Sequence, residues 1–178
     1  MGKTTKTAMA EAEPFNRREL VYDAVLYGLG ATLGELAKTP SKAVVAEEIH
    51  RSFGKYIYEY LTKNGVELGR GETPQEITEH IVKTFIEKLD FAELELVEPT
   101  KDRGNRAVWR NLLGLRAYEE LSKRYPDPFL SCPLNAVIRH ILEKKGHTLI
   151  VYGCKVDSAN QILESWEGIK EGTKFLTK

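Results

Sequence analysis

The sequence predicts an α+β domain, with an N-terminal helical half of three helices followed by an antiparallel sheet of about four strands. Apolar residues recur at helical spacing over residues 14–89, and a two-residue alternation replaces that spacing after Asp90. The strand candidates come in two pairs, with helical segments between them, in the order strand, strand, helix, helix, strand, strand. Pairs joined by short turns pair antiparallel, so we expect the helices to pack on one face of the sheet.

Helix boundaries are marked by local signals in the N-terminal half. A wide apolar stripe predicts a mostly buried helix over residues 14–37, and the glycines within it indicate close helix packing. Thr39 and Pro40 are typical of a helix start, and this second helix should end near residue 65. Thr73 and Glu76 form a capping-box pattern that opens the third helix.

The C-terminal half alternates between strand and helix patterns. Ser131 is a candidate cap for the last helix, and Gly146 a candidate stop. The segment 147–156 is apolar on both strand faces, which favours a central strand. The remaining predicted elements are strands over residues 94–98, 106–112 and 161–169 and a short helix over residues 115–124.

Length and composition are those of one globular domain. We interpret residues 1–13 as a flexible leader and residues 14–178 as a single domain. The 26 basic residues balance the 26 acidic ones, so the net charge of the chain does not favour binding to nucleic acid. Apolar runs are shorter than the roughly 18 to 20 residues of a membrane span, so we expect a cytoplasmic protein without such a span.

Four residues form a candidate metal or thiol site: Cys132, His140, His147 and Cys154. All four side chains can bind zinc, and a thiol beside a histidine could act as a nucleophile. Their spacing matches no compact zinc motif, and the sequence contains no hydrolase or zinc-protease signature. We favour the interpretation that the cysteines are small buried hydrophobes and the histidines surface groups, and we expect no zinc and no other certain cofactor.

A partial family resemblance rests on the order of elements and on a few segments. Residues 44–61, centred on Ile49-His50-Arg51-Ser52-Phe53-Gly54, match a helix of the family, and a helix beginning at Cys132 precedes a strand ending at Cys154. In these features the chain resembles the 4-vinyl reductase-like small-molecule-binding domain, whose fold is shared with TRAPP tethering subunits and haem nitric-oxide sensors. The chain has Ile162 where the family commonly has a third cysteine, and it lacks the Tyr-x-Ser-x-Arg haem motif.

The resemblance implies a homodimer that holds a hydrophobic small molecule between helices and sheet. We therefore expect a ligand-binding or sensor protein rather than an enzyme, with Cys132 and Cys154 facing one another at the rim of the pocket. The alternatives are a scaffold or tethering subunit acting through protein contacts, and a thiol- or zinc-dependent enzyme. The residues predicted to line the pocket are Tyr27, Phe53, Tyr56, Trp109 and Tyr152.

Overall fold

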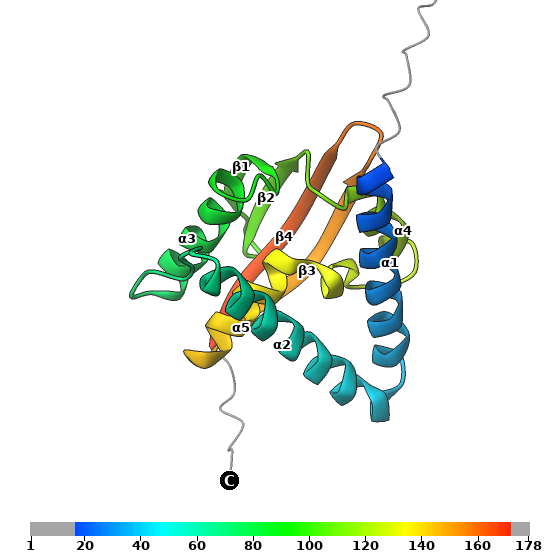
Figure 1. Ribbon diagram of the computed structural model, residues 1–178, viewed down its shortest axis with the longest axis horizontal. Helices are drawn as coiled ribbons and strands as arrows, with labels where there is room; N and C mark the ends of the chain where they lie inside the picture. The colour runs from blue at the N-terminus through cyan, green and yellow to red at the C-terminus, as the bar shows by residue number, and fades with distance from the viewer. Residues whose placement is uncertain (1–16, 172–178) are drawn as a thin grey trace, which may run out of the picture.

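The computed structural model describes residues 17–171 and shows an α+β fold, as predicted from the sequence (Figure 1). The predicted leader lies outside the described residues. The elements are α1 (Arg17–Ala37), α2 (Pro40–Lys63), α3 (Pro74–Glu87), β1 (Glu93–Pro99), β2 (Asn105–Arg110), α4 (Leu115–Ser122), the 3₁₀ turn η1 (Pro128–Ser131), α5 (Pro133–Lys144), β3 (His147–Asp157) and β4 (Ile162–Glu171).

The four strands form one antiparallel sheet in the order β1-β2-β4-β3. The prediction that residues 147–156 form a central strand was wrong, because β3 lies at an edge and β2 and β4 are central. Both faces of β3 carry apolar side chains for different reasons. Leu149 is buried beneath the helices, whereas Tyr152 on the opposite face packs along the neighbouring strand, over Gly168.

Helix α5 forms the centre of the helical layer. It contacts β3 on one side and α2 on the other, and α3 also packs against it. Eight of its twelve residues are buried, including Val137, Ile138 and Leu142. The helix is therefore enclosed by the sheet and by other helices, and its position determines theirs.

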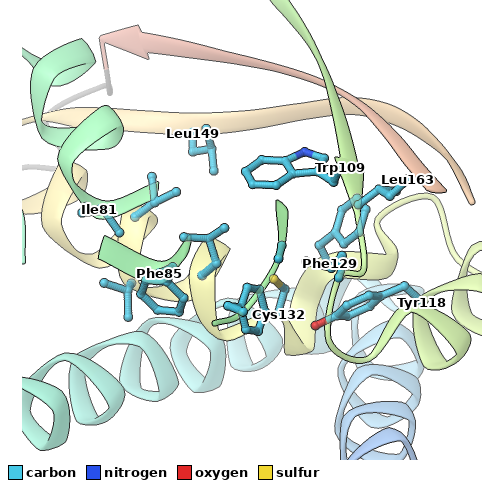
Figure 2. Close-up of a cluster of buried hydrophobic side chains, with 14 of the residues drawn as sticks. Ile81, Phe85, Trp109, Tyr118, Phe129, Cys132, Leu149 and Leu163 are labelled. Carbon is cyan, nitrogen blue, oxygen red and sulfur yellow. The ribbon is translucent and has the colours of Figure 1, made fainter. Parts of the chain in front are cut away.

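The hydrophobic core fills the space between α5, α3 and the covered face of the sheet. Trp109 from β2 and Leu149 from β3 lie under the strands, while Ile81 and Phe85 of α3 approach from the helical side (Figure 2). Tyr118 packs edge-on against Phe129, with ring centroids 5.4 Å apart, and extends this core toward α1 and α4.

Local capping signals agree with most of the predicted helix ends. Thr73 and Glu76 form both hydrogen bonds of a capping box at the start of α3. Gly146 follows α5 with a φ of 80°, a left-handed conformation that favours glycine. The prediction that Ser131 caps α5 was wrong: Ser131 ends η1, and Cys132 is the N-cap because Pro133 occupies the first helical position.

Glycine permits two close helix approaches that the sequence indicated only in general terms. In α1, a Cβ at Gly30 would lie 2.5 Å from Leu121 of α4. In α2, a Cβ at Gly54 would lie 2.1 Å from the Ala136 carbonyl oxygen of α5. The second contact involves backbone, so a side chain there could fit only if the two helices moved apart. Within residues 17–171, no helix combines the length and apolar character needed to cross a membrane.

We predict that Gly54→Ala lowers the free energy of unfolding by about 1–3 kcal/mol, the usual range for overpacking a core. Gly28→Ala is the control, since nothing lies within 4 Å of a Cβ at Gly28. That change should stabilise α1 by about 0.5–1 kcal/mol because alanine has the higher helix propensity. Urea denaturation of both variants measures the difference, and equal stability of the two would contradict the close α2–α5 contact.

Candidate functional site

A pocket of about 140 Å³ lies between α3 and the covered face of the sheet. It exists because α3 buries Ile77, Ile81 and Phe85 while packing against α5, and turns a second side, with Thr78 and Val82, toward the strands. The lining residues are Gln75, Thr78, Glu79 and Val82 of α3, Leu94 and Val97 of β1, Asn105, Ala107 and Trp109 of β2, Leu149 of β3, and Glu167, Gly168 and Ile169 of β4.

Strand register explains why the lining residues share one face. Directly opposed residues of antiparallel strands point to the same side of the sheet. Asn105 of β2 is opposite Glu167 of β4, which is in turn opposite Val151 of β3. Two residues further along β2, on the same face, Ala107 is opposite Ser165. The covered face therefore carries a polar strip through its middle, flanked by apolar side chains.

Glu167 is the unusual member of this strip. The residue as a whole is half-buried, yet desolvation of its carboxyl group raises the pKa. A hydrogen bond with Ser165 and the charge of Arg139 oppose this increase, while the charge of Asp127 adds to it. The protein therefore places an ionisable group where its charged form is disfavoured, a property that recurs at functional sites.

Ser165 links the Glu167 carboxyl to the indole of Trp109 through hydrogen bonds. The indole Nε1 donates a hydrogen bond to Ser165 Oγ at 3.2 Å. Trp109 and Glu167 also line a second, smaller cavity of about 20 Å³ on the side of Cys132 and Asn135. That volume can hold about one water molecule, so only the larger pocket is wide enough for an organic ligand.

Of the five residues predicted to line a ligand pocket, the structure places one, Trp109, in this space. Tyr27 is half-buried on α1, with the Arg124 guanidinium 5.8 Å from its ring centroid. Phe53 is half-buried on α2, and Tyr56 on the same helix is 63% exposed. Tyr152 is 37% exposed, on the face of the sheet that the helices do not cover. The structure thus does not bring these five side chains together at the α3–sheet pocket.

The predicted metal or thiol residues are also dispersed. Cys132 is buried at the start of α5 and Cys154 is half-buried on β3, and both are free thiols. Burial raises the pKa of each thiol to about 11, which disfavours the nucleophilic thiolate. His140 is buried 5.7 Å from the Tyr58 ring, and His147 begins β3. In the described part of the chain, no group of three or more His, Cys, Asp or Glu side chains is arranged to hold a metal ion.

Sequence reasoning missed Glu167 and the face of α3 that lines the pocket. A signal for Glu167 was present, because it shares strand parity with Leu163 and Ile169, which both point to the covered face. Ile162 and Trp166 have the other parity, so apolar residues occur on both faces of β4 and neither face stands out.

Comparisons of the chain with family models, curated proteins and solved structures gave no match.

We predict that Glu167→Gln stabilises the protein at pH 7. The unfolded carboxyl ionises near its ordinary pKa of 4.5 and the folded one at a higher pH. The wild type therefore loses stability as the pH rises from about 4.5 through the folded pKa, and glutamine removes this loss. The advantage of the variant should shrink as the pH falls toward 4.5.

Thermal or urea unfolding at several pH values measures this difference. Glu87→Gln, at an exposed residue of α3 outside the pocket lining, is the control and should change stability by less than about 0.5 kcal/mol throughout. If Glu167→Gln were less stable than the wild type at neutral pH, the conclusion that desolvation of the Glu167 carboxyl costs stability would be wrong.

Proposed function

We propose that the protein binds a small, mainly apolar molecule in the pocket between α3 and the sheet. The observation that carries this proposal is the pocket itself, about 140 Å³ of space bordered by Trp109, Leu149 and Ile169. An apolar cavity of roughly 150 Å³ is large enough to hold benzene. Ligand sites typically combine apolar walls with a few polar groups, which Asn105 and Glu167 supply here.

The tryptophans provide a direct test. The chain has two, and Trp109 lines the pocket while Trp166 lies on the opposite face of the sheet, paired with Arg106 of β2. We predict that benzyl alcohol shifts the indole N–H signal of Trp109 in a ¹H–¹⁵N spectrum and leaves that of Trp166 in place. A spectrum in which neither signal moves at millimolar benzyl alcohol would refute the proposal.

Two variants locate the site. Val82→Phe extends a ring from α3 into the pocket, so it should weaken benzyl alcohol binding at least tenfold. The double variant Phe53→Ala/Tyr56→Ala alters the pocket predicted from the sequence and should bind as the wild type does, because neither residue lines the α3–sheet space. The reverse result, loss in the double variant and binding in Val82→Phe, would place the ligand among the α1 and α2 aromatics instead.

A second candidate function, action through protein contacts, is favoured by an exposed apolar stripe on α2. Val45, Ile49, Tyr56 and Tyr60 recur at intervals of four, seven and four residues and so share one side of the helix. All four are at least 38% exposed. Exposed tyrosine and aliphatic side chains on one side of a helix are typical of interaction sites, and a second copy of the chain would satisfy the predicted homodimer.

We predict that Tyr56→Glu converts such a dimer to a monomer, because a charge would be buried at its centre. Light scattering after size-exclusion chromatography measures the mass. Glu47→Lys, exposed on the opposite side of the same helix, is the charge-changing control and should leave the mass unchanged. A monomeric wild type would exclude this use of the stripe and leave the pocket proposal intact.

A further inference from the structure

We propose that the α3–sheet pocket selects a compact apolar amine, whose ammonium group binds the Glu167 carboxylate while its ring lies against Trp109. The inference rests on the proposed function, since it concerns the same pocket. It names the chemical class of the ligand, which neither the fold nor the volume of the pocket supplies.

The charges around the pocket have one sign. Two of the lining side chains are ionisable, and both are glutamates, Glu79 at the α3 side and Glu167 at the sheet side. The lining contains no lysine, arginine or histidine. Glu79 is exposed, and Gln75 Nε2 donates a hydrogen bond to it at 2.9 Å. Such a lining attracts cations and repels carboxylate ligands.

Nearby cations do not replace a ligand charge at Glu167. Arg139 of α5 acts on Glu167 through its charge, but its guanidinium forms an ion pair with Asp127 at 2.9 Å. Asp127 in turn acts on Glu167 in the opposite sense to Arg139. From the strands, β2 presents the neutral Asn105 and β3 the neutral Val151 opposite Glu167. The carboxyl therefore lies near one positive and one negative side chain, whose charges act on its pKa in opposite directions.

The hydrogen-bonding capacity of Glu167 also exceeds what its surroundings use. An ionised carboxylate can accept about four hydrogen bonds. Ser165 hydrogen-bonds to it, and the Ser165 oxygen already accepts the indole N–H of Trp109. A ligand ammonium carries three donors and a positive charge, so it offsets the desolvation of the carboxylate and uses its free lone pairs. A neutral hydroxyl offers one donor and no charge.

The shape of the pocket limits the rest of the ligand. Trp109, Leu149 and Ile169 supply an apolar wall suited to one ring. The volume of about 140 Å³ accommodates a single aromatic or aliphatic ring with a short substituent. The Trp109 ring adds a second attraction for an ammonium group through its π face.

Three probes of the same ring size test the inference at pH 7: benzylamine as the cation, benzyl alcohol as the neutral analogue and benzoate as the anion. Titrations follow the Trp109 indole N–H, with Trp166 as the internal reference. We expect wild type to bind benzylamine about tenfold or more tightly than benzyl alcohol, since hydrogen bonds between charged groups are the stronger ones. Benzoate should bind more weakly than both.

The isosteric variant Glu167→Gln should lose this preference, so that benzylamine falls about tenfold or more to the level of benzyl alcohol while benzyl alcohol itself is unchanged. Glu87→Gln, on α3 but outside the pocket lining, is the matched control, and benzylamine affinity should change less than threefold because the group is exposed and its charge is screened. The comparison of the three probes on wild type needs no variant and decides the question if Glu167→Gln does not fold.

The outcomes separate the two proposals. Equal binding of benzylamine and benzyl alcohol to wild type, or an unchanged preference in Glu167→Gln, would overturn the amine inference and leave the ligand-binding pocket standing. Tighter binding of benzoate would also overturn it, and would assign the dominant charge to Arg139. If benzyl alcohol and benzylamine both leave the Trp109 signal in place, the pocket proposal itself fails.

Discussion

The burial of α5 is the constraint on which the other elements depend. This helix lies against the sheet through β3, so α2 and α3 pack on α5 instead of covering the same strands. The contact between Gly54 and the Ala136 carbonyl oxygen brings α2 close to α5 on one side. On the other, α3 buries Ile77, Ile81 and Phe85 and leaves Thr78 and Val82 facing the sheet across open space. The pocket is thus a consequence of α3 being supported by a helix rather than by the strands.

The desolvated carboxyl of Glu167, in the middle of the covered face, lowers the stability of the fold, so its presence calls for a functional explanation. An apolar residue at position 167 would continue the surface formed by Leu163 and Ile169 and would add hydrophobic stabilisation. Ser165, buried beside it and hydrogen-bonded to Trp109, has the same parity, so two successive covered positions of β4 are polar. Local departures of this kind from good core design are expected where a protein binds something.

Features set by a few neighbouring residues could be predicted from the sequence, and features set by distant contacts could not. The capping box at Thr73 and Glu76 involves residues three apart, so the start of α3 can be predicted directly from the sequence. The edge position of β3 depends on which strand β2 pairs with, and alternation within residues 147–156 carries no such information. An apolar outer face usually indicates a second covering layer, but here Tyr152 packs along β4 over Gly168.

The side of α2 that faces the core explains why the two predicted pocket residues on this helix, Phe53 and Tyr56, lie elsewhere. Aromatic side chains on helices predict burial because they are apolar, and Tyr56 has the apolar character of a core residue. The buried side of α2 is instead set by Gly54, which contributes no apolar side chain but allows α5 to approach. Tyr56 and Tyr60 consequently lie outside the buried face. Trp109 reaches the pocket because a β-strand has two faces, and its pairing with Leu94 and Leu163 fixes which of them is covered.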